Sequence, residues 1–215
     1  MSPRFLTWSK PASRATLAHS LAHGSIAITS SDTVLGFLAP VTLEGFKKLD
    51  SLKQRENKPY LIVMADKSKL NHFIDLPLSA GLQRMIDSCW PGPVTLIFKA
   101  RESLPSYVKG PDGTVALRVP QHAGLLDILK DMSGLFSTSA NLHGQPIPET
   151  VSDIDPKILQ AVACVVTDES EKKQVIPSTI LDCTQVQVRV VREGAYAINE
   201  LEALYGAPFL KPLTK

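Results

Sequence analysis

The stretch that decides the fold class is LKQRENKPYLIVM, at Leu52–Met64, because it joins a helical pattern to a strand pattern. Upstream of it, leucine and phenylalanine recur at helical spacing, which predicts a helix over residues 42–52. Downstream, YLIVM is a short apolar run that predicts a buried strand over residues 60–64. Between the two lie three cations, Lys53, Arg55 and Lys58. Such a cluster is typical either of a solvated, basic helix end or of a cradle for an anion.

The same alternation extends through the chain in both directions. Helices are predicted at residues 15–22, 42–52, 79–89, 123–131 and 155–163. Strands are predicted at residues 26–29, 60–64, 94–98, 115–119, 135–137, 164–167, 179–181 and 186–191. Because strands and helices alternate irregularly, the predicted fold is α/β, with a twisted mixed sheet and flanking helices. Residues 1–205 are expected to form one domain, and residues 206–215 a loose C-terminal tail.

Composition restricts the classes of function. The chain has 215 residues, a net charge of +2 and 44% apolar residues, which is ordinary for a globular enzyme or binding domain. No apolar run approaches the length of a membrane span and no signal peptide is recognisable, so we expect a cytoplasmic protein. Cys89, Cys164 and Cys183 are widely spaced and are interpreted as buried thiols. His19 and His23 lack a third ligand, and no metal site is predicted.

Polar residues gather in five clusters, each at the end of a predicted strand. The clusters are SSDT at 30–33, KQRENK at 53–58, the pair Thr114 and Arg118, STSAN at 137–141, and PST at 177–179 with Arg192. Hydroxyls and cations dominate, which predicts an anionic ligand that carries phosphates. The motifs GxxxxGK(S/T), HExxH and GxSxG are absent, so the ligand hydroxyls are not interpreted as nucleophiles.

Seven segments, in this order, resemble the YrdC-like family of L-threonylcarbamoyladenylate synthases. They are SSDTVLG, KQRENKPYL, WPGPVT, LRVP, STSANLHG, PSTILD and REG, and they run from Ser30 to Gly194. Each segment is a weak signal alone, but the ordered set is specific. The length is similar to that of the short form, without an extra C-terminal domain. The resemblance implies that L-threonine, bicarbonate and ATP are joined into threonylcarbamoyl-AMP with release of pyrophosphate. A separate transferase then modifies tRNA.

The resemblance also implies roles for individual residues. ATP would contact Lys53, Arg55, Lys58, Thr114, Ser139, Asn141 and Arg192. L-threonine would contact Thr33, Arg118, Ser137 and Ser178. Lys53 and Arg55 would also stabilise, together with Mg²⁺ bound to ATP, the charge that moves onto pyrophosphate.

The chain departs from the family pattern at four places. Ser30 replaces a usual proline, Leu35 replaces a usual tyrosine, and the spacing from Arg55 to Lys58 is one residue short. Met64 stands where many relatives carry a histidine near threonine. Two alternatives therefore stay open. One is a non-catalytic module that binds tRNA or double-stranded RNA, and the other is a diverged relative that uses a different acyl or carbamoyl substrate.

Overall fold

The structure is a computed structural model that describes residues 2–54, 59–168 and 176–212. Its strands are β1 (Arg4–Thr7), β2 (Ala27–Thr29), β3 (Gly36–Pro40), β4 (Leu61–Val63), β5 (Val94–Lys99), β6 (Thr114–Arg118), β7 (Leu135–Ser139), β8 (Cys164–Thr167), β9 (Thr179–Asp182) and β10 (Arg189–Arg192). Its α-helices are α1 (Pro11–Ala22), α2 (Leu43–Lys53), α3 (Ala80–Cys89), α4 (Ala123–Leu129), α5 (Pro156–Ala161) and α6 (Ile198–Tyr205). Two 3₁₀ helices, η1 (Lys67–His72) and η2 (Val151–Asp153), complete the described elements.

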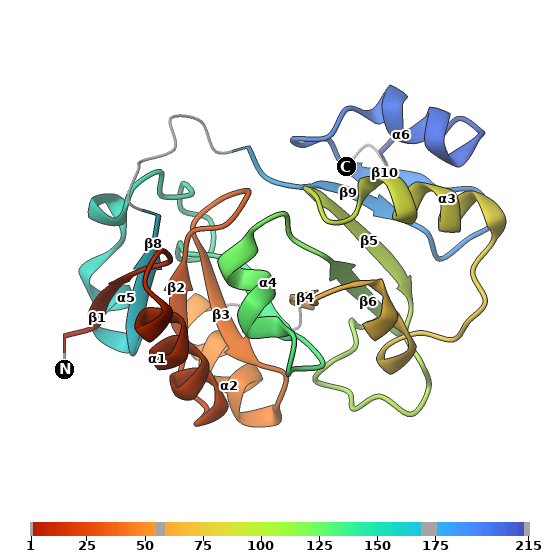
Figure 1. The fold of residues 1–215 in the computed structure, drawn as a ribbon. Helices are drawn as coiled ribbons and strands as arrows, with labels where there is room; N and C mark the ends of the chain where they lie inside the picture. Colours follow the sequence, from red (N-terminus) through yellow and green to blue (C-terminus); the bar gives the residue numbers. More distant parts are fainter. Residues whose placement is uncertain (1, 55–58, 169–175, 213–215) are drawn as a thin grey trace.

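All these strands join one sheet in the order β1-β8-β2-β3-β7-β4-β6-β5-β9-β10 (Figure 1). The sheet contains both parallel pairs, such as β4 with β6 and β5 with β9, and antiparallel pairs, such as β3 with β7 and β5 with β6. Strands distant in sequence therefore become neighbours in the middle of the sheet. The predicted α/β fold with a twisted mixed sheet is confirmed.

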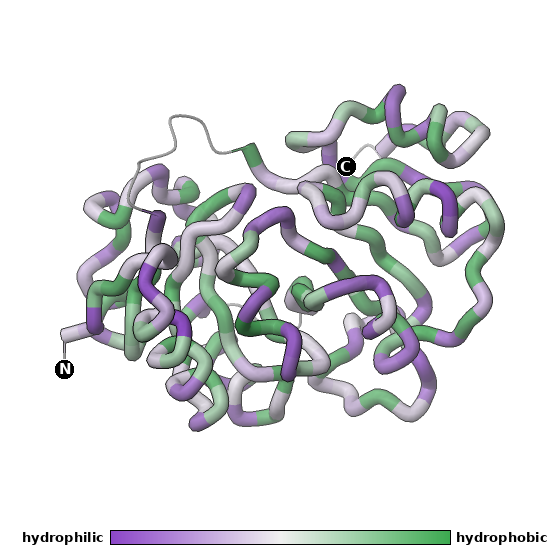
Figure 2. Tube along the Cα trace, in the orientation of Figure 1, coloured by the Kyte–Doolittle hydropathy of each residue, from purple (hydrophilic) through white to green (hydrophobic). Residues whose placement is uncertain are grey.

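The two faces of the central strands have different surroundings, because successive side chains of a strand point to opposite faces. On one face, which we call the core face, Ile62, Leu96 and Leu117 are fully buried in the larger hydrophobic cluster. That face is covered by the apolar sides of α2, α3, α5 and α6. Figure 2 shows the corresponding hydrophobic stretches along the strands. The core face fixes the sheet and leaves the opposite face for other uses.

The opposite face, which we call the pocket face, is covered only in part. Leu17 and Leu21 of α1 and Leu125 and Leu129 of α4 pack there against β2, β3 and β8 in a second buried cluster. Helix α4 lies over the middle of the molecule, beside the central strands (Figure 1).

Several helices begin or end at residues that commonly cap helices. Thr42 caps α2 by accepting a hydrogen bond from Gly45 N, and Ser79 caps α3 by accepting one from Leu82 N. Helix α1 is followed by Gly24 in the left-handed region, at φ +77°. None of the helices in the described part of the chain is long and apolar enough to cross a membrane.

Five described elements were not predicted: β1, β3, α6 and the two 3₁₀ helices, η1 and η2. The segment expected to be a loose tail also differs from that expectation over residues 206–210. Phe209 is 9% exposed, and the backbone of Leu210 forms hydrogen bonds with Val188 and Val190. The chain there follows the sheet beside β10 and belongs to the ordered structure.

Candidate functional site

A cavity of about 370 Å³ opens on the pocket face of the central strands. Residues two apart in one strand line it together, for example Leu61 with Val63 and Thr95 with Ile97. Its walls thus come from β2, β3, β7, β4, β6, β5, β9 and β10, and from the Ser30–Thr33 turn that precedes β3. We expected the site at the ends of the strands; the structure places most of it on the face of the sheet.

Arg118 forms the charged floor of the cavity and is 4% exposed. Its Nε donates a hydrogen bond to Gly92 O at 3.0 Å, and its Nη1 donates to Thr33 Oγ1 at 2.9 Å. Its Nη2 lies 2.6 Å from Asp32 Oδ1 in a buried ion pair. The predicted partners Arg118 and Thr33 therefore meet, although 85 positions separate them in the chain.

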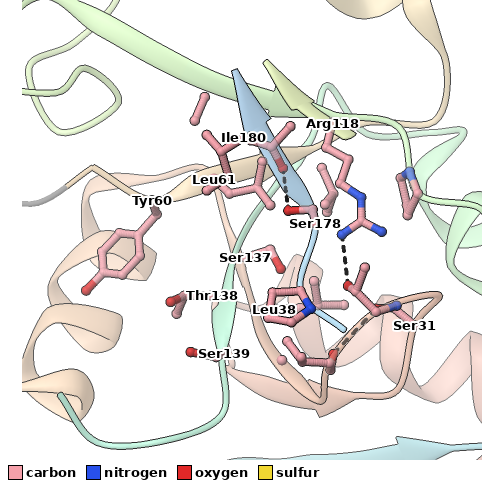
Figure 3. Close-up of a pocket in the computed structure, with 18 of the residues that line it drawn as sticks. Ser31, Leu38, Tyr60, Leu61, Arg118, Ser137, Thr138, Ser139, Ser178 and Ile180 are labelled. Atoms are coloured by element: carbon pink, nitrogen blue, oxygen red, sulfur yellow. Dashed lines mark hydrogen bonds between the residues drawn. The ribbon is translucent and has the colours of Figure 1, made fainter. Parts of the chain in front are cut away.

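Ser178 lies on the opposite side of this floor, in the PST segment before β9. Its Oγ is 2.9 Å from Thr95 Oγ1, and its backbone oxygen accepts hydrogen bonds from Nε and Nη2 of Arg192. Figure 3 shows Arg118, Ser178 and Ser137 reaching the same space from three different strands or strand ends. The structure brings these three residues together at one cavity, and their role as contacts of L-threonine stays a prediction.

The electrostatics of this end of the cavity favour an anion. Burial lowers the pKa of Arg118, and the charge of Asp32 opposes that effect. Burial also lowers the pKa of Arg192, and the nearby positive charge of Arg118 lowers it further. Both guanidinium groups line the cavity, and the carboxylate of Asp32 forms an ion pair with Arg118 and not with Arg192, so a carboxylate or phosphate ligand would relieve their repulsion.

A second side of the cavity carries a row of hydroxyls. Ser137, Thr138 and Ser139 belong to β7, are half-buried and line the cavity. The predicted strand ends at Ser137, but β7 continues through Ser139 and pairs with β3 as far as Gly36. The row ends near Pro59 and Tyr60, which also line the cavity and follow the basic segment.

Lys53 occupies a different position from the one expected. It ends α2 and is 3% exposed, and its ammonium donates to Ser139 O at 2.8 Å, Asn141 O at 2.6 Å and Asn141 Oδ1 at 2.9 Å. It does not line the cavity. An ammonium surrounded by three acceptors holds the STSAN segment in place, so the geometry differs from the direct phosphate contact implied by the resemblance.

The remaining predicted nucleotide residues are dispersed. Asn141 accepts a hydrogen bond from Ser139 Oγ at 2.6 Å and lies outside the cavity lining. Thr114 is half-buried at the start of β6; a side chain placed on Gly110 would touch both Thr114 Oγ1 and Pro59. Arg55 and Lys58 lie outside the described residues.

Sequence reasoning missed two contributors to the site. Thr95 follows WPGPV and was interpreted as a plain strand residue, although its hydroxyl meets Ser178. Asp32 belongs to SSDT, and it forms an ion pair with Arg118, which lies 86 positions later in the chain. Nothing in the local sequence indicates this pairing. Met64, which stands where many relatives carry a histidine near threonine, is buried in the core. Its neighbour Val63 lines the cavity instead.

The site lacks features of metal or thiol chemistry. Among the described residues, no group of three or more His, Cys, Asp or Glu side chains could hold a metal ion. Burial raises the pKa of Cys89 to about 12 and that of Cys164 to about 11, which disfavours the reactive thiolates. The arrangement can bind and orient anionic groups, and its described thiols are inert.

The sequence of this chain matches a known protein family. Residues 19–194 match the protein-family model Sua5_yciO_yrdC, which is described as Telomere recombination. The chain belongs to the Sua5/YciO/YrdC family. A family member from Idiomarina loihiensis, named threonylcarbamoyl-AMP synthase, is 31% identical over 80% of this chain and 94% of its own. One of the same name from Pyrococcus abyssi is 26% identical over 88% of this chain and 56% of its own.

Solved structures of the Sua5/YciO/YrdC family share the fold. Sua5 from P. abyssi, in a crystal structure complexed with L-threonine, has a TM-score of 0.84 at 22% identity over 98% of this chain and 62% of its own. YciO from E. coli has a TM-score of 0.79 at 18% identity over 94% of this chain and 100% of its own. The chain therefore spans the whole length of YciO and about three fifths of the length of Sua5.

Proposed function

We propose that this chain is a threonylcarbamoyl-AMP synthase, which forms threonylcarbamoyl-AMP and pyrophosphate from L-threonine, bicarbonate and ATP. One observation carries the proposal: Arg118 and Arg192 flank a hydroxyl-lined cavity in a member of a family that includes threonylcarbamoyl-AMP synthases. The neighbour Sua5 of P. abyssi is complexed with L-threonine. This support favours the synthase over a non-catalytic RNA-binding module.

L-threonine would occupy the charged floor of the cavity. Its carboxylate would accept hydrogen bonds from the guanidinium of Arg118, and the hydroxyls of Thr33, Ser137 and Ser178 would surround the rest of the amino acid. No carboxylate lines the cavity among the described residues, since Asp32 lies behind Arg118. A substrate ammonium would find no acidic partner on that lining, and this favours the neutral amine that the reaction needs.

ATP would extend from this floor along β7. Ser139 and Arg192 would contact its phosphates, with Thr114, Arg55 and Lys58 beyond them; Lys53 and Asn141 would shape the strand end that receives them. Mg²⁺ would enter bound to the triphosphate, because the described residues include no cluster that could hold it. Bound there, it would neutralise phosphate charge.

The chemistry needs orientation and charge stabilisation. The amine of threonine and bicarbonate give a carbamate and water. A carbamate oxygen then attacks the α-phosphorus, and the bond to the β-phosphate oxygen breaks to release pyrophosphate. The protein would hold the two anions within reach of each other, and Arg192, between the two subsites, would stabilise the charge that develops at phosphorus.

The test is pyrophosphate release by purified protein. Release should require ATP, L-threonine and bicarbonate together. Arg118→Ala should weaken L-threonine binding most and Arg192→Ala should weaken ATP binding most, as measured by calorimetric titration. ATP cleavage without a threonine requirement would favour a diverged substrate, and tight RNA binding without turnover would favour the RNA-binding module.

The chemistry of the product indicates which class of enzyme would act next. Threonylcarbamoyl-AMP is an activated acyl adenylate, so a transferase that passes the group to tRNA would consume it. Direct contact of this chain with tRNA or with that transferase is a separate expectation. It can be checked by asking whether the product forms at the same rate when both are absent.

A further inference from the structure

Asp32 lies behind the guanidinium of Arg118, on the side away from the cavity. Its side chain is 11% exposed and does not line the cavity, whereas Arg118 does. Oδ1 of Asp32 faces Nη2 of Arg118 at 2.6 Å, and Oδ2 accepts a hydrogen bond from Gln121 N at 2.9 Å. One carboxylate therefore ties the Ser30–Thr33 turn to both the arginine and the segment that follows it.

The contacts of Arg118 leave donors for a ligand. A guanidinium carries five N–H groups, and the described residues take hydrogen bonds from two of them, at Gly92 O and Thr33 Oγ1. Nη2 lies 2.6 Å from Asp32 Oδ1, and the hydrogen bond and charge of that carboxylate favour the charged form of Arg118. Asp32 thus fixes the position and charge of the guanidinium, occupies one of its donors and leaves about two N–H groups for a ligand.

A fixed negative charge is needed at this place. Burial alone makes the charged form of Arg118 costly, and the neighbouring Arg192 adds repulsion. An arginine without a partner would turn toward solvent or toward other acceptors whenever the cavity holds no ligand. Opposed by Asp32 from behind, it keeps its ligand-facing edge directed into the cavity.

We propose that Asp32 is a positioning residue for amino-acid recognition, which acts through Arg118 and sets the affinity for the substrate carboxylate. The inference rests on the proposed function and deepens it. It concerns one of the two subsites: affinity for the amino acid depends on Asp32, whereas affinity for ATP does not.

The same turn has a second anchor, which offers a matched control. Ser30 Oγ donates to Asp168 Oδ2 at 2.9 Å, and the other carboxylate oxygen of Asp168 is 3.2 Å from His122 Nε2. Trp8 Nε1 donates to Ser30 Oγ at 3.1 Å. These contacts hold the turn without touching Arg118. Loss of this anchor loosens the turn, and loss of Asp32 also releases the arginine.

The experiment compares Asp32→Asn with Asp168→Asn in the full chain. Asparagine at position 32 keeps the shape and the acceptor for Gln121 N–H but removes the charge. We expect the Kd for L-threonine, by calorimetry, and the KM for L-threonine, by pyrophosphate release, to rise about 10-fold or more. The KM for ATP should stay within about 2-fold. Asp168→Asn should lower Tm, with threonine affinity within about 2-fold of wild type.

Asp32→Glu is the second variant, for use if Asp32→Asn does not fold. It keeps the charge but pushes the guanidinium by one methylene, so threonine affinity should again fall. Threonine affinity equal to wild type in either folded variant overturns the inference, as does an equal loss in Asp168→Asn. A wild-type protein that binds no L-threonine overturns both this inference and the proposed function; wild-type binding with an indifferent Asp32 overturns this inference alone.

Discussion

At the residue scale, Lys53 belongs to a motif expected to bind phosphate, but its contacts in the fold are with the protein itself. The sequence places it in a basic cluster, where contact with phosphate is the natural expectation. In the fold its ammonium is buried among three oxygens of Ser139 and Asn141. Burial of this charge is tolerated because the ammonium forms three charge-assisted hydrogen bonds and also lies over the ring of Phe37, 5.9 Å from its centroid. Lys53 therefore determines where β7 ends and where the hydroxyl of Ser139 points.

Lys53→Met tests this role. The variant keeps the apolar stem and leaves the oxygens of Ser139 and Asn141 buried without their donor. We expect the free energy of unfolding to fall by ~3 kcal/mol, measured by urea titration, and ATP affinity to fall with it. Lys48→Met, at an exposed position of the same helix, should change stability by less than about 0.5 kcal/mol. Full stability with loss of ATP binding would make Lys53 a phosphate contact instead.

Residue types alone predicted the cations and hydroxyls of the site but not how they pair. Arg118, Thr33, Ser137 and Ser178 were predicted as one group and do meet at the cavity. Asp32 and Thr95 escaped notice because their role depends on partners 86 and 83 positions away. Long-range pairs of this kind arise from sheet topology, which a single sequence does not specify.

At the scale of the element, the Arg-Glu-Gly segment after β10 explains how Ser178 is held. The α-carbon of Gly194 lies so close to the backbone of Pro177–Thr179 that any side chain would collide with it. Ala195 N then donates to Pro177 O at 2.9 Å, and Arg192 holds Ser178 O. The glycine is required for close approach of two backbones and not for an unusual φ angle.

Gly194→Ala should therefore displace the PST segment. We expect a loss of roughly 1–3 kcal/mol in the free energy of unfolding, as is usual for overpacking, and a several-fold weaker affinity for L-threonine. The measurements are thermal denaturation and calorimetry. Glu193→Ala, at the exposed neighbouring position, is the control and should change neither quantity. Wild-type affinity in Gly194→Ala would show that the segment can shift without harm.

Secondary structure was predictable where the apolar pattern was strong. Helix α3 and strands β4 and β5 follow runs whose periodicity is unambiguous. Strand β3, GFLAP, was missed because glycine and proline are disfavoured in strands and its burial comes from neighbours on both sides. The strand predicted at residues 135–137 proved too short, because β7 continues through Thr138 and Ser139, two polar residues that line the cavity.

At the scale of the whole molecule, the site exists because one sheet has two unequal faces. Helices cover the core face fully, whereas α1 and α4 cover only part of the pocket face. Residues of eight strands line the cavity in the remaining area. The alternation that buries Ile62, Leu96 and Leu117 is therefore the same alternation that exposes their neighbours to a ligand. Fold class was predictable from this pattern, but strand order was not.

Residues 209 and 210, near the end of the described chain, pack against the sheet. Phe209 packs in the larger cluster, and Leu210 pairs beside β10, the strand that carries Arg192. We expect Phe209→Ala to lower the free energy of unfolding by ~2–3 kcal/mol, somewhat less than for a fully buried phenylalanine. Val186→Ala, at a 97% exposed position, should be neutral. Equal stability of the two variants in thermal denaturation would restore the expectation of a loose tail from residue 206.

The most direct test of the account is a crystal structure of this protein with L-threonine and a non-hydrolysable ATP analogue. The account predicts the threonine carboxylate on Arg118, its remaining atoms among Thr33, Ser137 and Ser178, and the phosphates along the end of β7 toward Arg192. Density for both molecules outside this cavity, or a cavity that stays filled only with water at saturating concentrations, would contradict it.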